Sequence, residues 1–450
     1  EDGRLRDTVP KSCRQDMKAA VGAAVAAAER ARHMSAHERM SVLLRASEIL
    51  ECELEDFART IATEGIKTIR EARKEVARAA VTLRLSSEEA RRLAGETVPF
   101  DQMPGSEGRV GYYLPEPVGV IGAITPFNDP LNLVAHKVGP ALAAGNAVVL
   151  KPDSKTPLSA LKLARALQQA GLPDNLLQVV TGNGSEVGNA LVEDERVGMI
   201  SFTGGRATGE AIIRRGGLKK FSMELGSNAP VLIMNDADLD AAVPANVSGA
   251  YWAAGQNCLH VQRLLVQEET YDEFKARFVA GANARVVGPK LDEATDMGPL
   301  ISEEHARKVE AMVDEALAAG ATLLAGGTRR GSYYAPTVLE GVPEHCSLAR
   351  EEVYGPVSVL SSFSNLQEAV RQANAVEYGL QAAIFTRDLA TAFAAVKGLR
   401  YGGVMVNDST DYRIDAMPFG GVKGSGLGRE GVRFAVQEMT EPKLVCFNLA

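Results

Sequence analysis

The feature that most constrains the fold is an alternation of short apolar segments with helical segments. An apolar run from Val118 to Thr125 ends at Pro126, a helical pattern covers 130–144, and a second apolar run covers 147–150. A strand, a helix and a strand in this order predict two parallel strands joined by a crossover helix. The alternation continues, with helices predicted at 158–170, 184–192 and 209–215 and strands at 177–180, 199–202 and 220–224. We therefore predict a doubly wound α/β domain that binds ligands at the carboxyl ends of its parallel strands.

A second alternating series begins after Gly226. It predicts strands at 230–234, 263–266, 322–324, 357–363, 382–386 and 403–407, with helices at 239–252, 271–284, 303–319, 366–375 and 389–398. Strand and helix segments of these lengths predict a second α/β domain. A last helix is expected at 429–439.

The residues before the first strand have a different pattern, in which alanine and leucine recur at helical spacing among charges. This pattern predicts amphipathic helices at 14–32, 36–63 and 69–93. Between 97 and 117 the sequence changes to short extended pieces broken by prolines. The extended tail at 443–448 is expected to pair with the 97–117 segment or with the edge of another subunit.

Composition excludes several classes of protein. A chain of 450 residues is too long for one compact core, and a hydrophobic fraction of 46% with a charged fraction of 24% is typical of globular proteins. A net charge of −8 without a basic block argues against a nucleic-acid partner. No apolar run approaches the ~20 residues that a membrane helix requires. The five cysteines are widely spaced and form no Cys/His metal motif, so we expect reduced thiols in a cytoplasmic protein without a metal site.

Five short motifs place a reactive or polar side chain at a glycine or proline turn. They are Thr125-Pro126-Phe127-Asn128, Thr203-Gly204-Gly205-Arg206-Ala207-Thr208-Gly209, Glu224-Leu225-Gly226, Gly255-Gln256-Asn257-Cys258 and Glu351-Glu352-Val353-Tyr354-Gly355-Pro356. Each motif alone has a plainer interpretation. A lone cysteine is most often an inert core residue, a glycine-rich turn is most often only a turn, and adjacent glutamates usually lie at the surface. The 203–209 turn also joins a strand to a helix, a shape whose free N–H groups can hold a phosphate.

In combination and in this order, the motifs resemble those of the aldehyde dehydrogenase superfamily over essentially the whole chain. The motif ending at Asn128 is similar to the family's Pro-Trp-Asn, the motif at Glu224 to its Glu-Leu-Gly-Gly, and the motif ending at Cys258 to its Gly-Gln-x-Cys. The 351–356 segment resembles the family's Glu-Glu-x-Phe-Gly-Pro, and the segment from Pro418 resembles its C-terminal signature. One departure is Ser227, which replaces the second glycine of Glu-Leu-Gly-Gly.

The resemblance implies the fold and the division into domains. A Rossmann-type dinucleotide-binding domain is expected at 1–96 and 118–226, with 425–439 packing back on it. An α/β catalytic domain is expected at 227–424. Residues 97–117 and 440–450 are expected to form a small β bridging domain. Because the bridging domain joins subunits in this family, the resemblance implies a homodimer or a homotetramer.

The resemblance also implies the catalytic roles. The thiolate of Cys258 would attack an aldehyde carbonyl, and the Asn128 amide and the backbone N–H of Cys258 would donate hydrogen bonds to the oxyanion. Glu224 would activate the water that hydrolyses the resulting thioester. For Lys137, a part in proton transfer and a purely structural part both remain open.

Two alternatives to hydrolysis remain open at this point. Family members that transfer the acyl group to coenzyme A tend to lack the glutamate at the position of Glu224, so its presence favours hydrolysis to a free acid. A non-catalytic scaffold would bind a dinucleotide and turn over nothing, and the presence together of Cys258, Asn128 and Glu224 argues against it.

For the cofactor, the resemblance implies NAD or NADP. Lys151 resembles the family lysine that holds the adenosine ribose, and Glu352 resembles the residue that holds the nicotinamide ribose. In NAD-preferring relatives a glutamate commonly stands three residues after that lysine, where this chain has Ser154 followed by Lys155. Loss of a carboxylate and gain of an ammonium favour a 2′-phosphate, so we expect NADP to be accepted. The other residues expected to line the cofactor site are Thr125, Pro126, Phe127, Thr203, Gly204, Gly205, Gly209, Leu225, Gly226 and Tyr354.

For the substrate, the segment from Asn407 to Pro418 resembles a subgroup that includes lactaldehyde, succinic semialdehyde and phosphonoaldehyde dehydrogenases. Phosphonate-binding relatives tend to carry a histidine and an arginine where this chain has Asp129 and Asn257. We expect a small polar aldehyde, with an anionic one as a candidate. The residues expected to contact it are Arg78, Asp129, Asn257, Arg413 and Phe419, with His260 as a further candidate for a positive contact.

Overall fold

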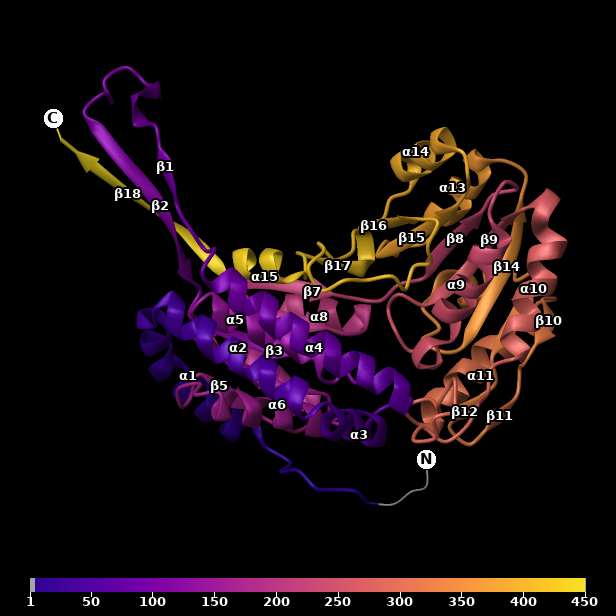
Figure 1. Cartoon of the computed structure of the whole chain (residues 1–450), viewed down its shortest axis with the longest axis horizontal. Coiled ribbons are helices and arrows are strands. Elements are labelled where there is room, and N and C mark those ends of the chain that lie inside the picture. Colours follow the sequence, from indigo (N-terminus) through magenta and orange to yellow (C-terminus); the bar gives the residue numbers. More distant parts are fainter. Residues whose placement is uncertain (1–4, 450) are drawn as a thin grey trace.

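The computed structural model describes residues 5–449, which contain two large β-sheets, one small projecting sheet and a two-stranded sheet of β11 (Arg329–Arg330) and β12 (Tyr333–Tyr334). One large sheet has six strands and the other seven, and helices pack on them (Figure 1). All strand pairs inside the two large sheets are parallel except those at edge strands β10 and β17. The prediction of an α/β fold with parallel sheets is confirmed.

The six-stranded sheet has the order β17-β7-β6-β3-β4-β5. Its strands are β3 (Val120–Ile124), β4 (Ala147–Lys151), β5 (Leu177–Val179), β6 (Met199–Thr203), β7 (Lys220–Glu224) and the edge strand β17 (Gly426–Leu427). The connecting helices are α5 (Asn132–Ala143), α6 (Pro157–Gln169), α7 (Asn189–Glu193) and α8 (Arg206–Gly216). The chain reverses its direction of strand addition at β3, so the carboxyl ends of β3, β6 and β7 meet where a doubly wound sheet binds ligands.

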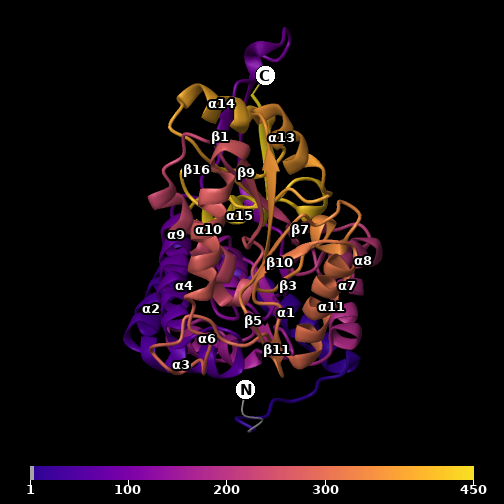
Figure 2. The same ribbon diagram turned by 90° about the vertical axis from the view of Figure 1, so that its right-hand side faces the viewer.

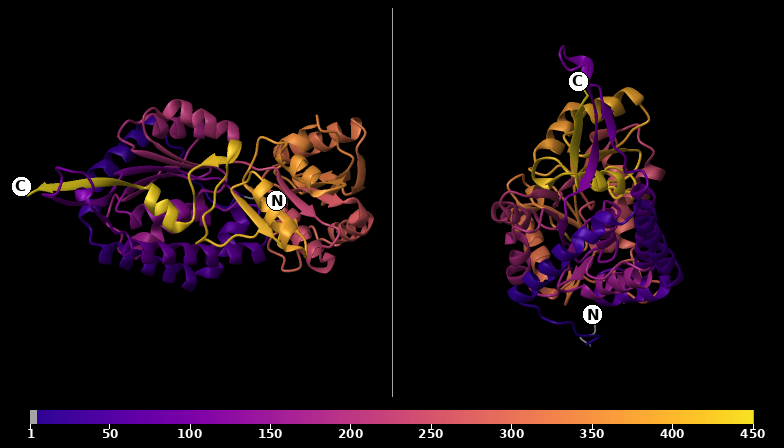
Figure 3. Two further views of the ribbon diagram at one scale, coloured as in Figure 1. Left: turned by 90° about the horizontal axis from the view of Figure 1, so that it is seen from above. Right: turned by 90° about the vertical axis from the view of Figure 1, so that its left-hand side faces the viewer.

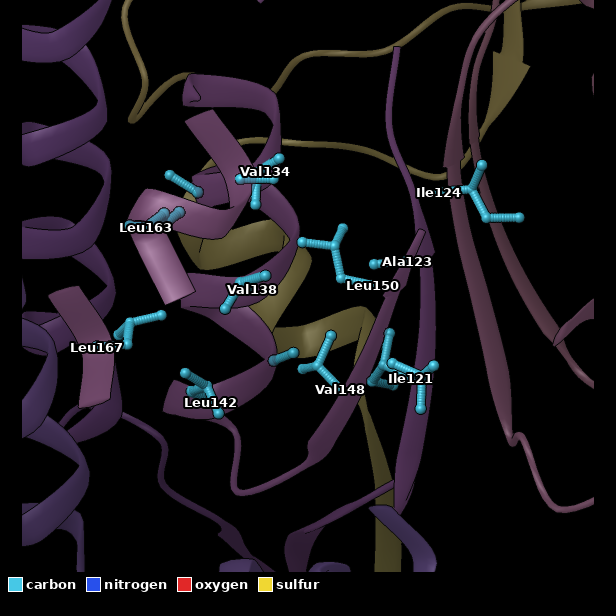
Figure 4. Close-up of a cluster of buried hydrophobic side chains, with 14 of the residues drawn as sticks. Ile121, Ala123, Ile124, Val134, Val138, Leu142, Val148, Leu150, Leu163 and Leu167 are labelled. Carbon is cyan, nitrogen blue, oxygen red and sulfur yellow. The ribbon is translucent and has the colours of Figure 1, made fainter. Parts of the chain in front are cut away.

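Part of the interior of this half is built from the aliphatic side chains of β3, β4, α5 and α6 (Figure 4). Ile121 and Val148 from the sheet face Val138 of α5, and all three are inaccessible to solvent. Strands buried on both faces read as continuous apolar runs, which is the pattern that identified β3 and β4 in the sequence. Each fully buried aliphatic side chain stabilises the fold by about 1.5–3 kcal/mol.

The N-terminal region has four helices: α1 (Arg14–His33), α2 (Ala36–Cys52), α3 (Leu54–Glu64) and α4 (Ile69–Ala90). The single helix predicted at 36–63 was wrong, because Glu53 leaves the helical conformation with φ −100° and ψ 20° and separates α2 from α3. Capping boxes begin α2 at Ser35 and α4 at Thr68, where Glu71 closes the box. Figure 2 shows α2 and α4 on one side of the molecule and α7 and α8 on the other.

Another helix prediction was also wrong in detail. The segment predicted as one helix at 184–192 begins with a π-helical turn, Gly184–Gly188, and only then becomes α7. Glycines at both ends of that turn lower its preference for a regular α-helix.

The seven-stranded sheet has the order β10-β13-β14-β9-β8-β15-β16. Its strands are β8 (Ala229–Ile233), β9 (Val261–Gln267), β10 (Thr322–Ala325), β13 (Thr337–Glu340), β14 (Val357–Phe363), β15 (Gln381–Phe385) and β16 (Gly403–Val406). Its helices are α9 (Leu239–Tyr251), α10 (Tyr271–Asn283), α11 (Glu303–Ala318), α12 (Ser347–Arg350), α13 (Leu366–Asn374) and α14 (Leu389–Gly398). The sequence did not predict β13, since four residues directly after Pro336 are too few to show an alternation.

The third sheet consists of β1 (Glu96–Val98), β2 (Arg109–Pro117) and β18 (Thr440–Asn448). Of the two pairings expected for the C-terminal tail, the structure has β18 antiparallel to β2 of its own chain over the whole length of both strands. Seen from above, this sheet extends beyond the rest of the molecule as an arm (Figure 3). The helix α15 (Val432–Glu438) leads into it and packs against α4 and α5.

The predicted division into domains remains our proposal, and its residues 1–4 and 450 lie outside the described part of the chain. The boundary at 226 falls between β7 and β8, which belong to different sheets. Within residues 5–449 no helix is long and apolar enough to cross a membrane.

Candidate active site

Cys258 follows a turn in which three consecutive residues adopt left-handed backbone conformations. Ala253, Ala254 and Gly255 have φ of 51°, 52° and 68°. A left-handed alanine costs about 1–2 kcal/mol, so the surrounding structure must impose this turn. At Gly255 a side chain is also excluded by space, because a Cβ atom would lie 2.1 Å from the carbonyl oxygen of Gly355. The turn therefore brings the cysteine loop directly against the 351–356 segment.

The first residue of this turn is held by a buried carboxylate from the helix α4. The N–H of Ala253 donates to Oε1 of Glu71 at 2.8 Å, and Oε2 of Glu71 accepts the N–H of Thr68 at 2.8 Å. Glu71, which closes the capping box of α4, therefore holds the loop before Cys258 as well as the start of its own helix. The sequence analysis did not single out Glu71, because its contact with Ala253 joins residues far apart in the chain.

Asn257 holds the other side of the same loop. Its Nδ2 donates to the carbonyl of Trp252 at 3.2 Å, and its Oδ1 accepts the N–H of Leu259 at 2.9 Å. Both ends of the amide are thus engaged with the backbone around Cys258, and the residue is buried. This placement favours a role in shaping the loop over the predicted contact with a substrate.

The 351–356 segment contacts two of the other motif loops through its last residues. The ring of Tyr354 meets the ring of Phe127 edge to face, with centroids 5.8 Å apart. Gly355 lies against Gly255, as described above. The loop after β3 and the loop before β9 therefore converge on the same segment.

The same segment reaches the motif that follows β7. Oε1 of Glu352 accepts the N–H of Ser227 at 2.8 Å, and a Cβ atom at Gly226 would lie 2.5 Å from Oε2 of Glu352. A glycine at 226 is therefore required for this approach. Burial raises the pKa of Glu352 to about 7, while the hydrogen bond from Ser227 lowers it.

Glu224, at the end of β7, is a buried carboxylate with no fixed partner. Neither of its oxygens has a hydrogen-bond partner within residues 5–449. Burial raises its pKa well above the usual value, and the neighbouring Glu430 raises it further, while Lys137 and Arg413 lower it. Because an unpaired buried polar group costs free energy, such a group is usually kept for a ligand or a reacting water.

Glu430 is a buried carboxylate beside Glu224 that the sequence did not reveal. Its Oε1 accepts a hydrogen bond from Nζ of Lys137 at 3.1 Å, and its Oε2 accepts one from Arg413 at 2.9 Å. Its backbone pairs with that of Phe419 in a β-bridge. The available signal was a lone acidic residue between Gly428 and Gly431, close behind the C-terminal signature.

Arg413 pairs with Glu430 and also acts electrostatically on the Cys258 thiol. Its guanidinium stacks 3.7 Å from the ring centroid of Phe419, and its side chain is only 7% exposed. Burial raises the pKa of the Cys258 thiol, and Arg413 lowers it. Three carboxylates raise that pKa further: Glu352, Glu224 and Asp129. Arg413 is thus the cation that favours a thiolate at Cys258.

Asn128 and Thr125 present buried polar atoms at the end of β3. Oδ1 of Asn128 and Oγ1 of Thr125 have no hydrogen-bond partner in the described part of the chain. Nδ2 of Asn128 donates to Oδ2 of Asp129 at 3.3 Å. An amide nitrogen carries two hydrogens, so one N–H of Asn128 is left to donate elsewhere.

Asp129 belongs to a buried charge cluster with Lys67 and Glu75. Nζ of Lys67 lies 2.5 Å from Oδ1 of Asp129 and 2.9 Å from Oε2 of Glu75. Although burial raises the pKa of Asp129, Lys67, Arg78 and Arg413 hold it below the usual value, so the carboxylate is ionised. Its side chain is 18% exposed.

Arg78 and His260 are the remaining candidates for a positive contact with the substrate, and they differ in exposure and in charge. Arg78 donates to both oxygens of Asp415, at 2.8 and 3.4 Å, and its side chain is 36% exposed, so part of its guanidinium stays accessible. His260 is buried, and burial lowers its pKa to about 3. The expectation of a positive charge at His260 was wrong, because a buried imidazole without a carboxylate partner stays neutral at pH 7.

Apart from Glu352 and Tyr354, which precede β14, the residues expected to hold a cofactor lie at or after the carboxyl ends of β3, β4, β6 and β7. Lys151 ends β4, is buried and forms no ion pair with any described residue, and burial lowers its pKa. Ser154 and Lys155 follow it at the surface.

Gly205 is the N-cap of α8, and a Cβ atom there would meet nothing within 4 Å. The first N–H groups of a helix have no partner inside the helix, so this end can accept an anion. Leu225 packs against Gly209 and fixes the distance between α8 and the loop after β7. Thr203 and Gly204 join β6 to this helix start, and the N–H of Gly204 donates to the carbonyl of Glu224 at 3.0 Å. Across residues 5–449 no group of three or more His, Cys, Asp or Glu residues is arranged to hold a metal ion.

Comparison with known proteins gives consistent relatives over the whole chain. The model of the "Aldehyde dehydrogenase family" matches residues 2–445. The chain is 52% identical to aspartate-semialdehyde dehydrogenase 1 of Pseudomonas canavaninivorans, covering 100% of this chain and 95% of that protein. It is 46% identical to 3-sulfolactaldehyde dehydrogenase of Priestia aryabhattai, covering 92% and 87%. Among solved structures, a glyceraldehyde-3-phosphate dehydrogenase of Methanocaldococcus jannaschii in complex with NADP is 39% identical, with a TM-score of 0.95 and coverage of 99% and 97%.

The contact between Gly255 and Gly355 predicts that Gly255→Ala destabilises the protein and displaces Cys258. Gly341→Ala is a matched control, because Gly341 has the same φ of 68° but nothing within 4 Å of the position of its Cβ. Both changes incur the cost of a left-handed alanine, about 1–2 kcal/mol, and only Gly255→Ala adds a clash. Thermal unfolding should show a clearly larger loss for Gly255→Ala, with a changed rate of Cys258 alkylation in this variant alone. Equal losses for the two variants would show that the close contact does not fix the loop.

Proposed function

The chain belongs to the aldehyde dehydrogenase family and is an enzyme that oxidises aldehydes, and from this premise we propose that it converts a small polar aldehyde to the free carboxylic acid with NADP or NAD. The observation that carries the proposal is that the Cys258 thiol and the Glu224 carboxylate lie within electrostatic range of the same guanidinium. Arg413 lowers the pKa of both groups, and neither oxygen of Glu224 has a partner in residues 5–449. A nucleophile and a free base in one site fit a reaction through a covalent intermediate.

In the first step the sulfur of Cys258 bonds to the aldehyde carbon and the carbonyl π pair moves to oxygen. Arg413 assists by favouring the thiolate. The remaining N–H of the Asn128 amide and the backbone N–H of Cys258 donate to the new oxyanion. A donor in this position contributes on the order of 10²- to 10³-fold to the rate.

In the second step the thiohemiacetal is oxidised to a thioester on Cys258. The nicotinamide of the cofactor, when bound, supplies the two-electron oxidation by accepting a hydride. The residues of the site keep the sulfur and the carbonyl oxygen in place as the oxyanion collapses to a carbonyl.

In the third step the thioester is hydrolysed. Glu224 takes a proton from a water, the water oxygen bonds to the acyl carbon, and the thiolate of Cys258 leaves. A positioned general base contributes ~10²- to 10⁴-fold. Lys137 and Glu430 form an ion pair beside Glu224, and we propose that they position it and set its pKa.

The chain's own residues fit a dinucleotide. We propose that the buried Lys151 ammonium holds the adenosine ribose, that Ser154 and Lys155 accept a 2′-phosphate, and that Glu352 holds the nicotinamide ribose. The open N-terminus of α8 at Gly205 supports binding of the pyrophosphate. Lys155 places an ammonium group at the surface, and Ser154 stands where NAD-preferring relatives carry a ribose-binding glutamate. Both features support acceptance of NADP.

For the substrate we propose a small aldehyde that carries an anion. The three relatives named above act, by their names, on aldehydes with a carboxylate, a sulfonate or a phosphate. In this chain Nε of Arg413 is buried without a partner among the described residues, and Arg78 is partly exposed. These two guanidinium groups are the cations with capacity to bind an anion. Phe419 holds the guanidinium of Arg413 flat against its ring.

The projecting arm exposes apolar side chains of β2 and β18, among them Val110, Leu114, Leu444 and Phe447. We propose that the arm joins copies of the chain into a dimer or a tetramer. A reactive thiol at Cys258 requires a reducing compartment, which is the reason for proposing the cytoplasm.

The function is tested by a panel of aldehydes, including succinic semialdehyde and lactaldehyde, assayed with NADP and with NAD and analysed for products. We expect a free acid in equal amount to the reduced cofactor, and turnover with NADP. A coenzyme A thioester as the obligatory product would contradict hydrolysis. A kcat/KM for NAD far above that for NADP would contradict the proposed role of Ser154 and Lys155. Iodoacetamide labelling of Cys258 without loss of activity would contradict its role as nucleophile.

The electrostatics of Glu224 predict a pH effect with a definite sign. Glu224 acts as a base only when deprotonated, so hydrolysis of the thioester is lost as the pH falls through its raised pKa. Glu430→Gln removes a neighbouring negative charge and leaves Lys137 and Arg413 less neutralised, so both changes lower the pKa of Glu224. The rising limb of the pH profile for deacylation should move to lower pH. The exposed Glu441→Gln is the control and should leave the profile in place. A shift to higher pH would show that Glu430 does not act on Glu224 in this way.

A further inference from the structure

We propose that Asp129 selects aldehydes that carry an ammonium group next to their anionic group, so that the preferred substrate is an amino-acid semialdehyde; this inference rests on the proposed oxidation of small anionic aldehydes. Asp129 is the one acidic side chain that follows the proposed oxyanion donor Asn128 directly. A carboxylate at this position repels a substrate that is only an anion, and it attracts a substrate that also has a cation.

The position of Asp129 places it in the reacting part of the site. Its Oδ2 lies 3.3 Å from Nδ2 of Asn128. Its charge raises the pKa of the Cys258 thiol and of the Tyr354 hydroxyl, which shows that it lies within electrostatic range of the sulfur and of the 351–356 segment. With 18% of its side chain exposed, Asp129 is the most accessible carboxylate of its cluster, since Glu75 is fully buried.

The bonding of the cluster leaves Asp129 with capacity for a second cation. Lys67 is shared between Asp129 and Glu75, so two carboxylates meet one ammonium. Glu75 is already saturated, since its oxygens accept from Lys67 and from the N–H groups of Leu131 and Asn132. Lys67 binds Oδ1 of Asp129, and the partner of Oδ2 is the neutral amide of Asn128. Oδ2 can therefore accept hydrogen bonds from a substrate ammonium.

The two guanidinium groups proposed to bind the anion act electrostatically on Asp129. Arg78 and Arg413 both lower the pKa of Asp129, so both guanidinium groups lie within electrostatic range of it. Each is paired with another carboxylate, Asp415 or Glu430, and each keeps a donor that is accessible or without a partner in residues 5–449. A carboxylate and an ammonium on one carbon atom fit a site with guanidinium donors and a carboxylate acceptor side by side. Charge-assisted hydrogen bonds of this kind are worth about 10- to 100-fold in affinity.

A plainer role for Asp129 is to neutralise Lys67. Both roles predict that loss of Asp129 harms the enzyme, so loss of activity alone does not separate them. Only the ammonium contact predicts that the effect depends on whether the substrate has an ammonium group.

Aspartate 4-semialdehyde and succinic semialdehyde form a matched pair for the test, because they share the same carbon chain, aldehyde and carboxylate and differ only in the ammonium group. The wild-type enzyme should have the higher kcat/KM for aspartate 4-semialdehyde. In Asp129→Asn the ratio of the two kcat/KM values should fall about 10- to 100-fold, because aspartate 4-semialdehyde loses the ammonium contact in addition to any loss that the two substrates share. Asp129→Glu, which keeps the charge, should restore part of the ratio.

Glu75→Gln is the control variant, since Glu75 pairs with the same lysine from the buried side. It should lower both kcat/KM values alike and leave their ratio unchanged. A wild-type preference for succinic semialdehyde, or an equal fall for both substrates in Asp129→Asn, would overturn the inference while leaving the proposed oxidation intact.

A binding measurement keeps the inference testable if Asp129→Asn does not fold or if neither aldehyde is oxidised. The acids L-aspartate and succinate should protect the Cys258 thiol of the wild-type protein from iodoacetamide, with L-aspartate effective at the lower concentration. Equal protection by the two acids, or stronger protection by succinate, would overturn the ammonium contact. Absence of oxidation with every aldehyde would overturn the proposed function, whatever the order of protection.

Discussion

The site depends on one constraint, that charges removed from water must be paired. Three cations are bound by carboxylates at short distances: Lys67 to Asp129 and Glu75, Lys137 to Glu430, and Arg413 to Glu430. Removing one member of such a pair would leave an unpaired buried charge, which costs several kcal/mol. Both oxygens of Glu224 lack a partner in the part of the chain that the structure describes, and burial accordingly raises its pKa and favours its neutral form. The pairing of the other charges is what allows this one carboxylate to stay free for a water.

The backbone directly before Cys258 is strained, and neighbouring side chains hold it in place. Ala253 and Ala254 occupy left-handed conformations that alanine avoids, and they do so directly before the nucleophile. Glu71 and Asn257 hold the turn from two sides, and neither residue needs to touch a substrate to do so. The strained turn leads the chain from the end of α9 to Cys258 and brings Gly255 against the backbone of Gly355.

The sequence named the residues that we propose for catalysis but not the network around them. Cys258, Glu224 and Asn128 could be named because each belongs to a motif of consecutive residues whose pattern survives without a structure. Glu430 and Asp415 could not, because their partners Lys137 and Arg78 stand about three hundred residues away in the chain, and no local pattern encodes such a pair. The same distinction between local and distant signals applies to the helices and strands. Buried parallel strands such as β3 and β4 have a strong apolar signal, whereas the break at Glu53 and the four-residue β13 depend on packing between distant segments.

The central claim is that Glu224 hydrolyses a thioester formed on Cys258. It is tested most directly by mixing the Glu224→Gln variant with an aldehyde substrate and NADP and measuring the intact mass of the protein. Our account predicts one burst of reduced cofactor and an adduct with the mass of one acyl group, which maps to Cys258 and decays ~10²- to 10⁴-fold more slowly than wild-type turnover. Undiminished steady turnover of Glu224→Gln without any adduct on Cys258 would contradict it.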